Sequence, residues 1–279
     1  MTYGATQQEM VSALQWYIDH GVTECLGDTP VNRFEIPAVV PAFAPVQTQS
    51  MEKRPLQEAS QTFLGKSDAY DEAIKLAKQA TSLEELAQII AEFDGVALKK
   101  TASNMVFSDG FAQADIMIIG EAPAADEDRV GKPFVGASGQ LLDRILKCID
   151  LDRTAEEPKQ SVYITNVLNW RPPGNRTPSQ SEIEVSLPFI ERHIQLAQPK
   201  ILVLCGGVPA KALLGKSDGI SRLRKKWHDY VPQTKGIGNA ETPIPAIVTY
   251  HPENLLRTPV QKRLVWEDML SLRKRHVSL

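Results

Sequence analysis

The sequence has few cysteines, and their spacing suits neither disulfides nor a metal site. Only three occur in 279 residues, at Cys25, Cys148 and Cys205, and none belongs to a CxxC pair. Isolated cysteines in odd number argue against a disulfide framework and against a self-contained zinc or iron–sulfur site. Cys205 ends the apolar run ILVLC, which favours a position in the core over a reactive role.

Long apolar runs and a strong excess of charge are also missing. No segment approaches the roughly 18 apolar residues that a membrane span needs. The opening MTYGATQQEMV lacks the basic and apolar regions of a secretory signal. The formal net charge of −3 argues against a histone-like protein that binds nucleic acid by charge alone, although a local basic face would suffice for phosphate contacts. We expect a cytoplasmic monomer with no membrane partner.

The motifs of several common site classes do not occur. Neither GxGxxG nor the P-loop pattern is present, which excludes the two common nucleotide-binding fingerprints. The five histidines show no metal-ligand spacing, so we expect no metal site; they are His20, His193, His228, His251 and His276.

The residue patterns along the chain divide it into four segments. Its start carries apolar residues at helical spacing, and a stretch rich in proline and alanine follows. Helical patterning then resumes, with a capping box from Ser82 to Glu85. We expect an N-terminal helix over 1–25, a linker over 26–65, a helical lead-in over 66–105 and the main domain over 106–279.

In the main domain, short apolar runs alternate with helical stretches. The runs cover 115–120, 162–166, 201–205 and 246–250, and the helical patterns cover 138–150, 178–197, 208–214 and 259–275. Thr177 before Pro178, with Gln180 following, predicts the start of the second of these helices. Near-continuous apolar strands separated by helices are typical of a parallel sheet covered on both faces. We therefore expect an α/β fold: a three-layer α/β/α sandwich with a four-stranded parallel sheet and a helical N-terminal extension.

Polar or small residues follow each expected strand, at the edge where a parallel sheet binds its ligands. The strand ends continue as GEAPAADED from 120, as Asn166 with RPPGNR from 171, as the glycine pair 206–207, and as YHPENLLR from 250. These segments would bring carboxylates, amides, an imidazole and arginines to one crevice.

Three of these segments resemble one enzyme family. GEAPAADEDRVGKPFVGASGQLLDRIL, VYITNVLNWRPPGNRTP and TYHPENLLRTPVQKR, in this order, are similar to the family four uracil-DNA glycosylases, and the resemblance runs from Phe93 to Leu272. It implies a four-stranded parallel sheet between helices. It also implies an enzyme that hydrolyses the N-glycosidic bond of flipped uracil in DNA, single- or double-stranded, to start base excision repair.

The resemblance also implies roles for matched positions. The uracil-binding positions are Gly120, Glu121, Ala122, Phe134, Asn166 and His251. The catalytic positions are Glu121, Glu127, Asn175 and His251. The DNA-binding positions are Arg171, Arg176, Lys225, Leu255, Leu256 and Arg257, of which Leu255 and Leu256 would enter the duplex.

The chemistry explains why such residue types are needed. Flipping a base costs a few kcal/mol, which a leucine wedge would offset. The Phe134 ring would stack on any base, whereas the Asn166 amide would accept from uracil N3–H and donate to O4, a pattern that cytosine reverses. His251 would donate to O2, where negative charge develops. A carboxylate, Glu121 or else Glu127, would stabilise the sugar cation or position water.

The sequence departs from the family pattern at two kinds of position. The four cysteines that hold the family's [4Fe–4S] cluster are replaced by Phe93, Val96, Trp170 and Ser186, none of which is a thiolate, so we expect no cofactor. Ala124 and Lys225 each replace a glycine of the family, and a need for positive φ at Ala124 would cost about 1 kcal/mol.

Plainer interpretations remain open at this point. Asn166 could only cap a strand, Phe134 could be core and His251 could be structural; Glu127 could be a solvated charge and Asn175 could only shape a turn. A module that binds DNA or a damaged base without turnover is the main alternative function. A small-molecule hydrolase on the same sheet is the other.

Overall fold

The computed structural model describes residues 66–238 and 241–279 of the chain. The expected helix over 1–25 and linker over 26–65 lie outside these described residues and stay predictions. Each described helix is too short or too polar to cross a lipid bilayer.

A mixed sheet of six strands forms the centre of the fold, in the order β1-β3-β2-β4-β6-β5. The strands are β1 Asp109–Gly110, β2 Ile116–Gly120, β3 Tyr163–Asn166, β4 Ile201–Cys205, β5 Trp227–Tyr230 and β6 Ile244–Thr249. The four inner strands are mutually parallel, as the four apolar runs predict. The expectation of a purely parallel sheet is wrong at its edges, because β1 and β5 pair antiparallel with β3 and β6.

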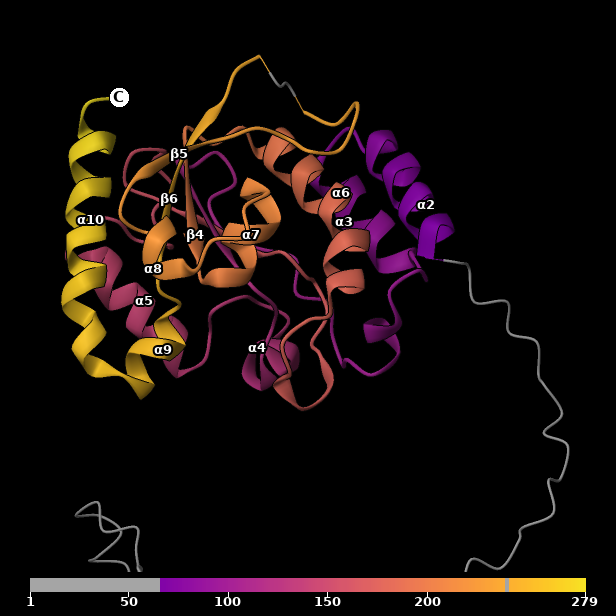
Figure 1. The fold of residues 1–279 in the computed structure, drawn as a ribbon, viewed down its shortest axis with the longest axis horizontal. Helices are drawn as coiled ribbons and strands as arrows, with labels where there is room; N and C mark the ends of the chain where they lie inside the picture. The colour runs from indigo at the N-terminus through magenta and orange to yellow at the C-terminus, as the bar shows by residue number, and fades with distance from the viewer. Residues whose placement is uncertain (1–65, 239–240) are drawn as a thin grey trace, which may run out of the picture. The chain divides into compact units, whose positions relative to one another are not determined.

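Helices cover both faces of this sheet, which confirms the three layers (Figure 1). The helices are α2 Lys66–Gln79, α3 Leu83–Glu92, α4 Ala125–Val130, α5 Ala137–Lys147, α6 Gln180–Ala197, α7 Gly207–Leu214, α8 Ile220–Leu223, α9 Pro252–Arg257 and α10 Lys262–Val277. Three short 3-10 turns, η1 Ala97–Lys100, η2 Pro173–Asn175 and η3 Pro259–Gln261, complete the described elements.

Alternation along the strands divides the core into two clusters. In β2, Met117 and Ile119 face one cluster, and Ile116 and Ile118 face the other. Successive strand residues point to opposite faces, so both faces are apolar wherever helices cover them. The first cluster includes residues of α2, α3, α6 and α7, and the second includes residues of α5, α9 and α10.

The helices of the expected lead-in, α2 and α3, share the first core cluster. The alanines of α2 are buried there, together with Leu86 of α3. Ser82 caps α3 as predicted, because its hydroxyl accepts the N–H of Glu85 at 3.2 Å. The returning bond is different: the Glu85 carboxylate accepts the N–H of Thr81, at 2.8 Å.

Helix α6 begins two residues later than the sequence suggested. Its N-cap is Ser179, whose N–H donates to the carboxylate of Glu182 at 2.7 Å while its hydroxyl accepts the N–H of Glu182. The proposed box between Thr177 and Gln180 is therefore wrong, because serine and glutamate satisfy both exposed donors of the first turn.

The strand register brings the functional segments to one edge. Gly120 at the end of β2 pairs with Asn166 at the end of β3. Cys205 at the end of β4 pairs with Thr249 at the end of β6, two residues before His251. Because all four inner strands run in the same direction, the segments that follow them leave the sheet together.

Candidate active site

A cavity of about 260 Å³ opens at this edge of the sheet. Segments far apart in the sequence share its wall: the β2–α4 loop with the start of α4, the loop into α5, the end of β3, η2, and the start of α9. The lining residues are Ala122, Ala124, Ala125, Asp126, Glu127, Phe134, Gly136, Ala137, Ser138, Asn166, Asn175, His251, Glu253 and Leu256. All three sequence motifs therefore contribute to one site.

Gly120 lies where the predicted base-stacking ring and base-reading amide meet. A Cβ added at Gly120 would lie 2.3 Å from Oδ1 of Asn166 and 2.7 Å from Cζ of Phe134. The ring and the amide thus converge on one glycine, which leaves the space that a side chain would fill. Both side chains are buried, with 3% of each residue exposed.

Phe134 adopts an unusual backbone conformation. Its φ of +53° lies in the left-handed region, which bulky residues rarely enter. Its ring stacks on the imidazole of His251, with centroids 5.2 Å apart and an interplanar angle of 29°. Phe134 belongs to the second core cluster and also lines the cavity, and strained backbone of this kind clusters at functional sites.

His251 is a neutral imidazole with a defined tautomer. It is the N-cap of α9, and its Nδ1 accepts the N–H of Glu253 at 3.2 Å. Burial lowers the pKa of His251 to about 4, so the ring is uncharged at neutral pH. Because a backbone N–H only donates, Nδ1 carries no proton, and the remaining proton is on Nε2. His251 therefore offers an Nε2–H donor at the cavity.

Two carboxylates of the first motif have different environments. Burial raises the pKa of Glu121 above its ordinary value, and the negative charge of Glu253 raises it further. Glu127 is buried and accepts the N–H of Ala124 at 3.1 Å, at the start of α4. The interpretation of Glu127 as a solvated charge is therefore wrong.

Glu253 and Asp126 are cavity residues that the sequence reasoning missed. Glu253 lies in the first turn of α9, in the HPEN segment that drew attention only to His251. Asp126 lies near Gly136, where an added Cβ would come within 3.0 Å of its carboxylate. Asp126 precedes the matched Glu127, and Glu253 is two residues after the matched His251, which was the available sign for each.

The arginines among the expected DNA-binding residues differ in their contacts, and none of them is a lining residue of the cavity. Asn175 accepts from Nε of Arg171 at 2.7 Å, which holds that guanidinium beside the cavity wall. Arg176 instead forms a two-pronged ion pair with Glu182, and it lowers the pKa of that carboxyl to about 2. Arg257 contacts Asn254 and Glu253 within α9.

The two leucines of α9 point in different directions. Leu255 is fully buried in the second core cluster, whereas Leu256 is 43% exposed and lines the cavity. The expectation that both enter the duplex is therefore wrong for Leu255, because consecutive residues on a helix cannot share a face. Leu256 is the one available to fill a gap in DNA.

The two residues that replace family glycines, Ala124 and Lys225, introduce no backbone strain. Ala124 has φ −95°, and Lys225 is not among the described residues with positive φ. Ala124 is the N-cap of α4 and contributes to the cavity wall, and Lys225 is exposed after α8. The predicted cost of positive φ at Ala124 therefore does not arise.

Side chains pack at the positions that match the family's cluster cysteines. Phe93 and Val96 are buried in the first core cluster, and Trp170 packs against it. The Phe93 ring meets the Phe189 ring edge-on, with centroids 5.1 Å apart. Ser186 is buried in α6. Within residues 66–238 and 241–279, no three His, Cys, Asp or Glu side chains are grouped to hold a metal ion.

Comparisons with known proteins agree with the three motifs. The family model described as the uracil DNA glycosylase superfamily matches residues 107–270. The chain is 35% identical to a type-4 uracil-DNA glycosylase of Pyrobaculum aerophilum over 67% of this chain and 91% of that protein. For the proteins of the same description from Sulfurisphaera tokodaii and Thermotoga maritima, identity is 34% and 31%, and coverage of the relative is 84% and 92%. The resemblance inferred from the motifs is confirmed.

Proposed function

Since the chain belongs to the uracil DNA glycosylase superfamily, we propose that it hydrolyses the bond between uracil and deoxyribose in DNA and so starts base excision repair. The observation that carries the proposal is the convergence of the Phe134 ring and the Asn166 amide on Gly120. An aromatic face and a fixed amide at one cavity are the two elements that a base-reading pocket needs.

In this proposal, Phe134 supplies affinity for the flipped base, and Asn166 supplies selectivity for uracil. Stacking contributes about 1–3 kcal/mol for any base. The Asn166 amide accepts from uracil N3–H through its oxygen and donates to O4 through its nitrogen. Cytosine has the opposite pattern at those two positions, so its binding would leave buried polar groups unpaired.

The proposed reaction uses charge stabilisation on both sides of the broken bond. The C1′–N1 bond breaks with its electron pair moving onto uracil, whose O2 becomes negative and accepts from Nε2–H of His251. A water molecule then adds its oxygen to the positive C1′, and the proton that it loses neutralises the uracil anion. Glu121 and Glu127 are the candidates to stabilise that cation, and of the two only Glu127 lines the cavity. Neither step requires a metal ion.

The expected DNA-binding residues have a separate proposed role. Leu256 fills the space left by the flipped base, and Arg171, Lys225 and Arg257 contact phosphates. Arg176 contributes less, since it is paired with Glu182. We propose that the protein acts on DNA as a cytoplasmic monomer.

We also propose that the enzyme carries no iron–sulfur cluster. Fe–S clusters are held by thiolates. The contact between the rings of Phe93 and Phe189 supports the proposal that side chains fill the space at these positions. Iron analysis of anaerobically purified protein tests this directly. We expect no bound iron and no visible cluster absorption; stoichiometric iron with that absorption would contradict it.

The activity is tested with oligonucleotides that carry a single uracil. We expect abasic sites in the presence of a chelator, and a loss of about 10²-fold or more in Asn166→Ala, because the amide is removed. Tight binding of uracil-DNA with no abasic product would favour the binding module instead. A protein that neither cleaves nor binds such DNA would overturn the proposal.

The hydrolase alternative has one sequence feature in its favour, which the structure weakens. Residues 215–219 read GKSDG, the spacing of a nucleophile elbow. This segment follows helix α7, however, and an elbow serine needs a turn from a strand into a helix. Ser217 therefore lacks the context of a hydrolase nucleophile.

A further inference from the structure

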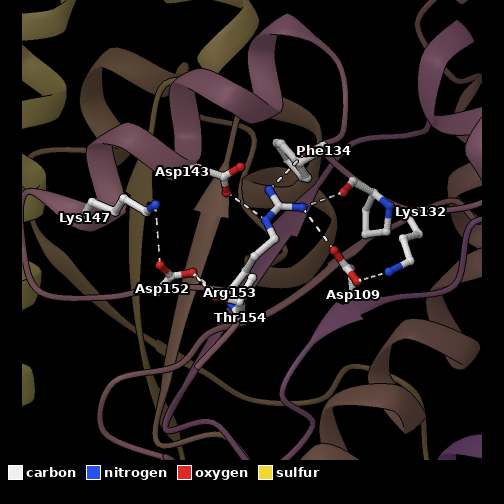
Figure 2. A network of polar contacts seen from close by, with 9 residues as sticks. Asp109, Lys132, Phe134, Asp143, Lys147, Asp152, Arg153 and Thr154 are labelled. Atoms are coloured by element: carbon white, nitrogen blue, oxygen red, sulfur yellow. Dashed lines mark hydrogen bonds and ion pairs between the residues drawn. The ribbon is translucent and has the colours of Figure 1, made fainter. Parts of the chain in front are cut away.

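We propose that Arg153 is the positioning residue that holds Phe134 in its base-stacking place; this rests on the function proposed above. Arg153 lies in the segment between α5 and β3 and does not line the cavity. Figure 2 shows its guanidinium enclosed by Asp109, Asp143 and the loop that carries Phe134. Only 11% of its side chain is exposed.

The guanidinium makes bonds to three parts of the fold. Nη2 donates to the carbonyl oxygen of Phe134 at 2.9 Å, and Nη1 donates to that of Pro133 at 3.2 Å. Nε donates to Asp143 of α5 at 2.7 Å, and Nη1 also contacts Asp109 of β1 at 3.2 Å. The two carboxylates fix the plane of the guanidinium, and that plane fixes two consecutive carbonyls.

Phe134 is a residue that needs such a restraint. A left-handed backbone at a bulky side chain persists only where the surroundings over-determine it. Gly139, in the first turn of α5, makes room for the same carbonyl, because a Cβ at Gly139 would lie 1.7 Å from the Phe134 oxygen. The Arg153 bonds to the carbonyls of Pro133 and Phe134 restrain the two peptide planes that flank Cα of Phe134. These planes set the direction of the Cα–Cβ bond from which the ring extends.

The segment that carries Arg153 is itself anchored. The Asp152 carboxylate accepts the N–H and the hydroxyl of Thr154, at 2.9 and 2.8 Å, and lies 3.6 Å from Nζ of Lys147 (Figure 2). Lys132, two residues before Phe134, pairs with Asp109 at 3.0 Å. The contacts of Arg153 and Lys132 therefore connect the Phe134 loop to β1 and α5 through charged groups that do not line the cavity.

The test compares Arg153→Lys with Arg273→Ala, a control that removes an arginine of α10, a helix with no residue in the cavity lining, where it pairs with Asp150. Lysine keeps the charge but cannot form the fork. We expect Arg153→Lys to lower kcat/KM on uracil-DNA by about tenfold to a hundredfold, mostly through KM, because stacking acts on ground and transition states alike. The control should match the wild type.

A double-mutant cycle separates positioning from general destabilisation. If Arg153 acts through the ring, Arg153→Lys should change kcat/KM by less than about threefold in a Phe134→Ala background. An equal loss in both backgrounds would overturn the proposal, because the effect would then not depend on the ring.

A measurement without turnover keeps this test separate from the proposed function. Fluorine NMR of protein containing 4-fluorophenylalanine, with the Phe134 signal assigned by its loss in Phe134→Leu, reports the ring directly. We expect that signal to shift or broaden in Arg153→Lys and not in Arg273→Ala. An unchanged signal would overturn the role of Arg153, whereas a shifted signal in a protein that forms no abasic sites would overturn only the glycosylase activity.

Discussion

A single methyl group at Gly120 should disable the site while leaving the fold in place. In Gly120→Ala, the new Cβ would lie 2.3 Å from the Asn166 oxygen and 2.7 Å from the Phe134 ring, where ordinary contact begins at 3.4 Å. Gly120 does not have a positive φ, so alanine fits its backbone and the effect comes from crowding alone. The amide, the ring or both must move by about 1 Å to relieve it.

The expected size of the effect follows from that displacement. A misplacement of about 1 Å at a reacting site costs about 10²-fold in rate, so kcat/KM on uracil-DNA should fall at least that much. Overpacking at a buried strand end should cost about 1–3 kcal/mol of stability, which leaves a folded protein. The assay is single-turnover cleavage of a uracil oligonucleotide, with thermal unfolding measured on the same samples.

Gly207→Ala is the matched control. It makes the same change at a position with no heavy atom within 4 Å of the added Cβ, and it should cleave like the wild type. Full activity in Gly120→Ala would mean that the Asn166 amide and the Phe134 ring do not both lie against that glycine.

Three further predictions follow from the site. The pKa of His251 is lowered from 6.5 to about 4, so its contribution to stability is complete above pH 6.5 and is lost as pH falls toward 4. The unfolding free energy of His251→Gln should therefore fall less steeply than that of the wild type between pH 6.5 and pH 4. Parallel curves of unfolding free energy against pH for the two proteins would contradict this. Leu256→Ala should weaken cleavage of double-stranded uracil-DNA more than cleavage of single-stranded uracil-DNA, while Leu255→Ala should lower the free energy of unfolding by about 2–5 kcal/mol. If melting and cleavage assays instead show Leu256→Ala to be the destabilised variant and Leu255→Ala the one with the double-strand defect, the two faces of α9 are assigned the wrong way round. Ala124→Gly should leave kcat/KM within about threefold of the wild type, since Ala124 carries no φ strain; a large gain would mean that its methyl obstructs the substrate.

The inner part of the fold could be predicted from the sequence because burial on both faces leaves an obvious pattern. The four parallel strands are near-continuous apolar runs, which have few other structural solutions. The edge strands lack that pattern: β1 has two residues, and β5 (Trp227–Tyr230) alternates buried and exposed positions. Short or half-exposed edges resemble loops in a single sequence.

Site residues could be grouped by the motifs, but their individual environments could not be predicted. The contacts of Arg153 reach Phe134 and Asp109 across 19 and 44 residues of sequence, a separation that local spacing does not reveal. The phase of the six-residue helix α9, which buries Leu255 and exposes Leu256, depends on packing against the second core cluster. The buried state of Glu127 depends in the same way on the N–H of Ala124, at the start of a helix too short to recognise in advance.

The central claim is that the Phe134 ring, the Asn166 amide and the His251 Nε2–H form one uracil pocket. A crystal structure of the protein with free uracil bound tests it most directly. We expect the base to be stacked on Phe134, with Asn166 bonded to N3 and O4 and His251 bonded to O2. Uracil bound at another place, or with its O2 turned away from His251, would contradict the account.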